Sequence, residues 1–419
     1  MTNPIKFSVF LLVAGLVAFA SCEKPTPAPD PEPTVFADPA NCFMVNEPGF
    51  YSFKANKGKT SEAVASIASV EVLWESFGTH EVPSKGDIIA EVSYSDGMVY
   101  FKTPKTLKDG NALIAAKDAS NNILWSWHIW VCAGWDATAT AQKYFNKSNG
   151  LASFGAVMDR NLGATSAAIN DIKAHGLLYQ WGRKDPFLGW DGYNAAGHTP
   201  AASTITWPDP VKTDAETGTI EYAIAHPTTY LYPGKPSSNV DWYYTKEFNF
   251  TDNTRWTDKL TLYDPCPAGW TLPEAHANNN QGLWYNALGN NWNVLYEYWD
   301  PTLLGVNMGT ILGDYNTIWY PEASLLYYED GKLYRTRQVY IWSLGVPNGD
   351  DGLPFKIGDG GSGGFDPSPY SMDVTGYSMY VGENTQHHTE AWAASHTFRA
   401  LAIPTRCVAI PGFAWPAGH

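Results

Sequence analysis

Charge is scarce in this chain, and positive charge is the scarcest. Charged residues make up 16% of the 419 residues, against roughly a quarter in average soluble proteins. The 27 Lys and Arg are outnumbered by 42 Asp and Glu, which gives a net charge of −15, and no long run of Lys and Arg occurs. Because phosphate backbones are bound by basic surfaces, the composition excludes nucleic acid as the default partner. A neutral glycan or a protein fits better.

Long apolar runs and metal-binding cysteine patterns are also missing. After residue 21 no segment approaches 18 consecutive apolar residues, so no membrane-spanning helix is expected. The five cysteines form no Cys-x-x-Cys pair and no Cys/His spacing typical of zinc. Aromatic and turn-forming residues are abundant instead: 14% are aromatic, with 37 Gly and 29 Pro. This composition favours a mainly β or α+β fold outside the cytoplasm and argues against a helical bundle.

The first 21 residues have the pattern of a secretory signal. Lys6 precedes the apolar stretch 7–21, and Cys22 follows directly. The block 19–22 (Phe-Ala-Ser-Cys) resembles the lipobox of bacterial lipoproteins, although Phe19 stands where Leu is most common. The resemblance implies cleavage before Cys22, acylation of its thiol and an anchor in the outer membrane. We expect display on the cell surface, with the periplasmic face left open; a plain secretory signal with an incidental Cys is the alternative.

Residues 22–37 predict an extended stalk. Five prolines alternate with small or acidic residues between positions 25 and 33. Such runs favour polyproline II, which rises about 3.1 Å per residue. The stalk would hold the folded part away from the bilayer.

Residues 38–133 are predicted to form an antiparallel β-sandwich. Turn signals, among them Asp96-Gly97, separate seven short runs of alternating or apolar residues. The expected strands are 42–45, 51–55, 70–74, 88–94, 98–103, 112–118 and 123–131. Seven short strands over such a length are typical of a sandwich.

The last of these expected strands has two distinct faces. Alternation places Trp125, Trp127 and Ile129 on one face and His128 and Trp130 on the other. No second ligand lies near His128 in the sequence. We therefore expect His128 at a strand surface or a domain boundary and not on a metal.

Four ordered blocks lie in the second part of the chain: 154–166 (FGAVMDRNLGATS), 176–187 (GLLYQWGRKDPF), 262–273 (LYDPCPAGWTLP) and 404–410 (PTRCVAI). Together they resemble the "major paralogous" domain of secreted Bacteroidetes and Fibrobacter proteins, which is related to C-type-lectin-like and formylglycine-generating-enzyme-like folds. The resemblance implies a lectin-like domain over residues 134–410, with a tail at 411–419. The blocks 40–53 (ANCFMVNEPGFYSF) and 125–130 (WSWHIW) also resemble the β-sandwich that often precedes this domain in Bacteroides surface lipoproteins.

The residues of these blocks predict local structure by themselves. Asp-Arg-Asn at 159–161 favours a polar turn held by an arginine–carboxylate fork. The apolar spacing in 177–181 predicts a short amphipathic helix. The charged residues at 183–185 predict an exposed ion cluster.

The odd number of cysteines predicts one outside any disulfide. With Cys22 acylated, four remain, and four allow three pairings. The lectin-like resemblance implies a bond between Cys266, in a rigid loop, and Cys407, in the last expected strand. Cys42 and Cys132 would join the first and last strands of the sandwich if they pair; two buried free thiols are the alternative.

Long aromatic-rich segments, 188–261 and 274–398, separate the blocks. Apolar ring faces beside amide and hydroxyl groups suit sugar rings and also protein partners. The candidate ligand-binding residues are Trp190, Trp242, Tyr243, Trp292 and Trp299. The alternative is that these rings fill the core.

The Gly-rich segment 347–368 carries Asp350, Asp351 and Asp359, which offer the hard oxygen ligands that calcium prefers. Its spacing fits no EF-hand, and the Glu-Pro-Asn and Trp-Asn-Asp triplets of calcium-dependent lectins are missing. A calcium cofactor held by these three aspartates is one interpretation, and a solvated loop is the other.

We expect a non-enzymatic, lipid-anchored surface protein that binds a glycan or a protein, as an adhesin or a pilus-associated component; the adhesin and pilus roles rest on analogy of architecture. A carbohydrate-active enzyme is the first alternative, because the separation of a catalytic carboxylate pair is spatial and not sequential. A structural assembly subunit, whose aromatic residues bury against a partner protein, is the second.

Overall fold

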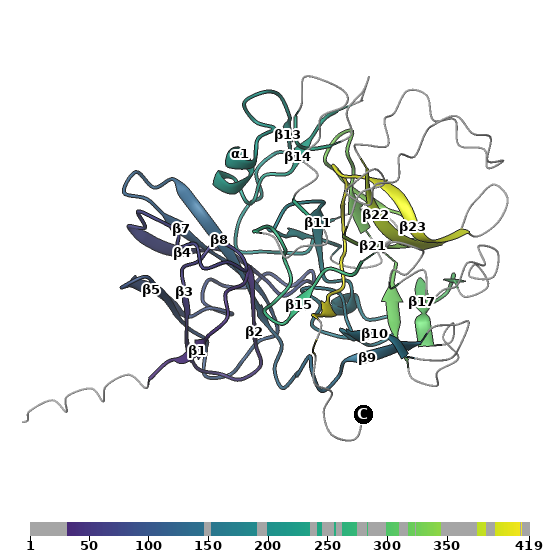
Figure 1. The fold of residues 1–419 in the computed structure, drawn as a ribbon, viewed down its shortest axis with the longest axis horizontal. Coiled ribbons are helices and arrows are strands. Elements are labelled where there is room, and N and C mark those ends of the chain that lie inside the picture. The colour runs from purple at the N-terminus through teal and green to yellow at the C-terminus, as the bar shows by residue number, and fades with distance from the viewer. Residues whose placement is uncertain are drawn as a thin grey trace, which may run out of the picture. The chain divides into compact units, whose positions relative to one another are not determined.

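The computed structural model describes residues 32–145, 152–190, 199–234, 241–244, 255–256, 262–274, 283, 299–309, 317–322, 324–344, 375–382, 390–410 and 412. Residues Pro33–His419 form one compact unit. Nearly all of its described regular elements are strands, beside the short helix α1 (Ile220–Ala225) and the 3-10 helix η1 (Ile172–Ala174) (Figure 1). The expected mainly β architecture is confirmed. No described helix is long and apolar enough to span a bilayer.

Two four-stranded sheets form the first part of this unit. One has the order β1 (Thr34–Phe36), β3 (Phe50–Lys54), β6 (Met98–Lys102), β5 (Glu91–Ser95). The other has the order β2 (Cys42–Val45), β8 (Ile123–Val131), β7 (Gly110–Lys117), β4 (Ser69–Ser76). All seven segments expected as strands in this region are strands, with ends that differ by a few residues.

The two sheets are not wholly antiparallel, and the fold begins earlier than expected. β1 runs parallel to β3, and β2 runs parallel to β8. β1 also lies within the range 22–37 that was predicted as a stalk. Period-2 alternation specifies the faces of a strand but not the direction of its neighbours, so the sequence could not reveal the two parallel pairs.

One apolar cluster is shared by the two sheets. Phe53 and Phe101 from the first sheet and Trp127 and Ile129 from the second all belong to it and are almost fully buried. Trp130, on the opposite face of β8, belongs to a different cluster formed largely by later parts of the chain. The two faces predicted for β8 are therefore correct.

The later strands of the described residues form five further sheets, and α1 lies at the periphery beside β13 and β14 (Figure 1). A four-stranded sheet has the order β15 (Trp270–Thr271), β25 (Val408–Ala409), β10 (Ala152–Val157), β9 (Gln142–Phe145), and a five-stranded sheet has the order β12 (Phe187–Leu188), β11 (Leu177–Gln180), β24 (Ala402–Ile403), β19 (Ser324–Leu326), β20 (Leu333–Arg335). Two three-stranded sheets have the orders β16 (Trp299–Asp300), β17 (Gly305–Asn307), β18 (Trp319–Pro321) and β21 (Gln338–Trp342), β22 (Thr375–Gly382), β23 (Glu390–Phe398). The last sheet pairs β13 (Val211–Lys212) with β14 (Leu231–Tyr232).

The helix expected at 177–181 is wrong, because Leu177–Gln180 form strand β11. This strand pairs with β12 on one side and β24 on the other, and all four of its residues are buried. A strand covered on both faces has a continuous apolar sequence, which short helices also show. Its length of four residues favours the strand.

Buried polar contacts fix the first two sheets on the rest of the unit. The Asn41 side-chain amide donates to the carbonyl oxygens of Leu262 (2.7 Å) and Asp264 (2.9 Å). The Lys59 ammonium lies 2.8 Å from the Asp264 carboxylate, and both side chains are buried. Residues before 133 and the loop around Cys266 therefore hold each other in place.

His128 lies at the same boundary. It is 1% exposed, and its Nε2 is 2.9 Å from Asn111 Oδ1. The Asn111 amide in turn donates to the carbonyl of Gly163 at 2.9 Å. Burial lowers the pKa of His128 to about 3. The folded protein therefore keeps this imidazole neutral at mildly acidic pH.

This neutral histidine predicts a loss of stability in acid. An unfolded histidine takes up a proton near pH 6.5, whereas folded His128 does so only near pH 3. The contribution is complete above pH 6.5 and falls as the pH decreases from there towards 3, by up to about 1.4 kcal/mol per pH unit. His128→Gln should flatten this dependence in urea unfolding at several pH values. The exposed His80 supplies the control His80→Gln; equal pH dependence in both variants would contradict the prediction.

Candidate functional site

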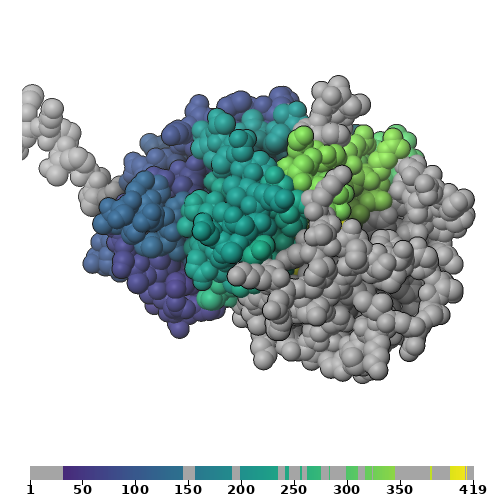
Figure 2. All heavy atoms as spheres, turned by 90° about the horizontal axis from the view of Figure 1, so that it is seen from above, coloured from purple at the N-terminus to yellow at the C-terminus, as the bar shows by residue number. Residues whose placement is uncertain are grey.

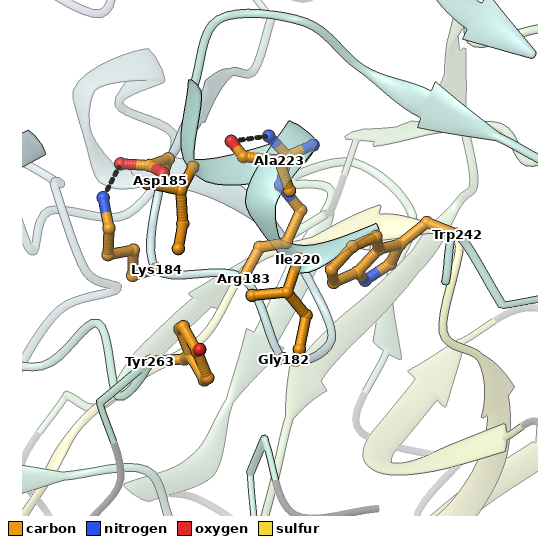
Figure 3. Close-up of a pocket in the computed structure, with 9 residues that line it drawn as sticks. Gly182, Arg183, Lys184, Asp185, Ile220, Ala223, Trp242 and Tyr263 are labelled. Carbon is orange, nitrogen blue, oxygen red and sulfur yellow. Dashed lines mark hydrogen bonds and ion pairs between the residues drawn. The ribbon is translucent and has the colours of Figure 1, made fainter. Parts of the chain in front are cut away.

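A small pocket lies between the segment 182–185, helix α1, Trp242 and Tyr263 (Figure 3). Its interior has room for about one water molecule, with a cavity volume of about 10 Å³. A cavity of this size cannot hold a sugar ring, and its interest lies in the charged residues of its wall.

Lys184 and Asp185 form a buried ion pair with a serine of strand β8. The Lys184 ammonium donates to Asp185 Oδ1 (2.7 Å), to Ser126 Oγ (2.6 Å) and to the Ser126 carbonyl (3.1 Å). It also lies 4.6 Å above the Trp125 ring. The expectation of an exposed ion cluster at 183–185 is wrong. Ser126 of β8, which is distant in the sequence, supplies acceptors that offset the desolvation of the Lys184 ammonium.

A lysine beside a serine is also the arrangement of a nucleophile with its base, but the geometry here is different. The Ser126 hydroxyl is buried and donates to Asp185 Oδ1 at 2.6 Å. Burial lowers the pKa of Lys184, opposed by the Asp185 charge, and each of its three protons has an acceptor. A nucleophile needs an accessible oxygen and a base with a free lone pair. Ser126, Lys184 and Asp185 therefore act as a structural contact that joins the turn at 182–185 to β8.

Arg183 holds the end of helix α1. Its guanidinium donates to the carbonyls of Thr229 (3.0 Å), His226 (3.3 Å) and Ala223 (3.4 Å) and to the Gln180 side chain (2.8 Å). Cations near the last carbonyls of a helix are stabilising. Burial lowers the pKa of Arg183 to about 10, so the side chain remains charged at neutral pH.

Behind the pocket, one carboxylate lies between two buried arginines. Asp241 Oδ2 is 2.6 Å from Arg255 and 3.4 Å from Arg399, and all three side chains are fully buried. The Arg255 guanidinium lies 4.5 Å from the Trp242 ring, and Arg399 lies 4.3 Å from the Trp181 ring. The cluster packs guanidinium planes against indole faces, which is a favourable cation–π geometry.

This cluster overturns part of the ligand-binding expectation. Trp242 is 1% exposed and donates to the carbonyl of Trp181 at 2.8 Å, and Tyr243 is half-buried beside it. Trp190 and Trp299 are also buried, in two other apolar clusters. These three tryptophans fill the core, because residues distant in the sequence cover them. Trp292 lies outside the described residues.

The calcium and lipidation expectations fall on parts of the chain that are not described. Asp350, Asp351 and Asp359 lie outside the described residues, and so does Cys22. Within the part of the chain that the structure describes, no group of three or more His, Cys, Asp or Glu side chains is arranged to hold a metal ion.

A disulfide bond joins Cys266 to Cys407, the pair that the lectin-like resemblance implies, with Cα atoms 6.0 Å apart. Cys42 and Cys132 are buried free thiols. Their strands are neighbours but parallel: Cys42 is opposite His128, and Cys132 lies four residues further on. Four residues of strand span about 13 Å, whereas a disulfide needs Cα atoms within about 7 Å. The proposed Cys42–Cys132 bond is therefore wrong.

The arginine–carboxylate fork at 159–161 is present and reaches the free thiol. Arg160 donates to both carboxylate oxygens of Asp159, at 2.9 and 3.0 Å. The Arg160 guanidinium also donates a hydrogen bond to Cys132 Sγ at 3.1 Å and lies 4.2 Å from the centroid of the Trp135 ring. Burial raises the pKa of Cys132 to about 11. This thiol therefore stays protonated and poorly reactive.

Two aromatic side chains of the described residues are exposed, Tyr244 (37%) and Tyr334 (39%). Tyr334 lies on the hairpin of β19 and β20, beside the half-buried Tyr327 and Tyr328. The sequence carries a signal for this group, since the run Tyr-Tyr-Glu-Asp-Gly-Lys-Leu-Tyr (327–334) has a turn dipeptide between tyrosines. The candidate residues taken from the sequence were mainly tryptophans and did not include these tyrosines.

Comparisons of the chain with known protein families, with curated proteins and with solved structures find no match in any of the three.

Proposed function

We propose that the chain is a lipid-anchored protein of the outer membrane, displayed on the cell surface, that binds a glycan or a protein ligand without catalysing a reaction. The signal sequence, Cys22 directly after it and the proline-rich stalk support the anchor. The compact unit that begins at Pro33 supports a separate folded module beyond the stalk.

In this proposal the module consists of a β-sandwich followed by a lectin-like domain. Two four-stranded sheets with a common apolar cluster support the first part. The bond between the loop at Cys266 and the final strand at Cys407 supports the second. Buried polar contacts join the two parts, and a fixed scaffold suits the presentation of a binding surface.

The observation that carries the proposed binding role is the hairpin of β19 and β20, where the exposed Tyr334 lies beside the half-buried Tyr327 and Tyr328. Tyrosine combines an apolar ring with a hydroxyl group and is enriched at recognition sites. Most other large aromatic side chains of the described residues serve the core. Tyrosines that remain at the surface of such a protein are therefore candidates for recognition.

The anchor and display can be tested with Cys22→Ala in the full-length chain. We expect the wild-type protein to incorporate radiolabelled palmitate and to be removed from intact cells by added protease. Cys22→Ala should abolish the label and weaken membrane association, because in this proposal the acyl chains on Cys22 form the anchor. Cys42→Ala, at a buried thiol, is the control and should leave labelling unchanged. A labelled protein that intact cells protect from protease would contradict surface display.

A further inference from the structure

We propose that the hairpin of β19 and β20 forms a binding subsite for one unit of a neutral saccharide, with Tyr327 and Tyr334 as stacking surfaces and the carboxylates of Glu329 and Asp330 as hydroxyl acceptors. This inference rests on the proposed binding function and specifies its location and its ligand class. It replaces the tryptophans that the sequence had suggested.

The rings of the hairpin are in contact with one another at inclined angles. The centroids of Tyr327 and Tyr334 are 5.2 Å apart with their planes at 61°, those of Tyr327 and Tyr328 are 4.5 Å apart at 47°, and Tyr328 meets Phe398 edge-on at 5.0 Å. The segment around 324–344 lies at the surface in Figure 2, where it appears light green beside the teal surface of residues 199–234. The rings thus extend from the core to the solvent, and Tyr334 is the outermost.

Backbone contacts make the hairpin rigid. Tyr327 and Lys332 are joined by a backbone hydrogen bond of 2.9 Å, and the Gly331 amide donates to the Tyr327 carbonyl at 2.8 Å. Gly331 has a φ of +67° and lies so close to Pro210 that a Cβ atom would meet it at 2.4 Å. The Tyr230 hydroxyl donates to the Leu326 carbonyl at 2.9 Å. A ligand would therefore meet a preformed surface, which reduces the entropy cost of binding.

Polar groups surround the rings on one side. The Tyr334 hydroxyl donates to Asp330 Oδ2 at 2.8 Å, and the Tyr328 hydroxyl is 3.4 Å from Glu329 Oε1. The hydrogen bond to Asp330 raises the pKa of Tyr334, and burial raises that of Tyr328. Both phenols therefore stay neutral at physiological pH. Asp330 Oδ1 also accepts from the Lys332 amide at 3.0 Å, so Asp330 offers a ligand only the remaining lone pairs of its two oxygens. The carboxylate of Glu329 can accept through its second oxygen.

This combination fits a neutral sugar better than other ligands. A pyranose presents apolar C–H groups on its faces and hydroxyl donors around its rim, which match an aromatic surface bordered by carboxylates. The adjacent Glu329 and Asp330 and the net charge of −15 disfavour anionic glycans. A peptide hot spot would need a deeper apolar pocket at its centre.

The test uses full-length protein in detergent on an array of neutral glycans with terminal hexoses and N-acetylhexosamines. The wild-type protein should bind a subset of them. Tyr334→Ala and Tyr327→Ala should each weaken binding by about tenfold or more, the usual effect of truncating a central aromatic contact. Tyr334→Phe keeps the ring and should keep most of the binding. Tyr244, which is 37% exposed and lies on another segment, supplies the control Tyr244→Ala, which should bind as the wild type does.

Unchanged melting temperatures would show that the variants are folded. Glycan binding that all hairpin variants retain would overturn the hairpin subsite and leave the proposed function standing. A wild-type protein that binds no neutral glycan would overturn the saccharide subsite, whereas the proposed anchor and display are decided separately by Cys22→Ala. Equal losses in Tyr244→Ala and the hairpin variants would also overturn it, since the effect would then not depend on this surface.

Discussion

Asp241→Asn should lower the free energy of unfolding by about 3–5 kcal/mol or more, the usual effect of removing one partner from a buried ion pair. Asp241 is the carboxylate between Arg255 and Arg399, and the side chains of all three are fully buried. Without its charge, the two buried guanidinium groups lose the carboxylate that lies between them. Their mutual repulsion adds to the cost of desolvation.

The measurement is urea unfolding followed by fluorescence, with the slope of the transition checked for a constant value. Glu62→Gln is a matched control, because it removes one carboxylate from the exposed pair with Lys57. Exposed pairs contribute about 0–1 kcal/mol. If Asp241→Asn shifts the midpoint no further than Glu62→Gln does, the cluster around Asp241 does not stabilise the fold as the geometry indicates.

Local patterns predicted the first part of the fold well. The alternation in 123–131 gave the strand β8 and separated Trp127, in the core between the sheets, from Trp130 on the other face. Both results depend only on the period of two residues in a strand. The direction of β1 and β2 does not depend on that period, and there the expectation was wrong.

Burial in the second part depends on residues that are distant in the sequence. Trp242 looked like an exposed aromatic in a long insertion, but Arg255 lies over its ring and the carbonyl of Trp181 accepts from its indole N–H. Lys184 looked like a surface charge, but it is buried and donates hydrogen bonds to Ser126 and Asp185. No local pattern encodes such partners. The sequence therefore predicted the strands of the first part better than the buried contacts of the second.

The second large effect concerns the bond between Cys266 and Cys407. It closes a loop of 141 residues, and for this length the chain-entropy model gives about 5 kcal/mol of stabilisation. Cys266→Ala together with Cys407→Ala should therefore lower the free energy of unfolding by about that amount. Cys42→Ala, which removes a buried free thiol, is the control and should cost much less.

Thiol counting checks the pairing independently. In denatured, unreduced Cys22→Ala protein, a maleimide reagent should label the two free thiols, Cys42 and Cys132. After reduction it should label all four remaining cysteines. Four labels before reduction, or none, would contradict the bonding described here.

The bond should also matter beyond its entropy, because the loop around Cys266 is where the two parts of the unit meet. Asn41 and Lys59 reach this loop from the first sheets, through Asp264. On its other side, β15 pairs with β25 directly after Cys407. Loss of the bond should therefore increase hydrogen exchange in β2 and β15 together. An increase confined to β15 would mean that the contacts of Asn41 and Lys59 hold the loop without the disulfide.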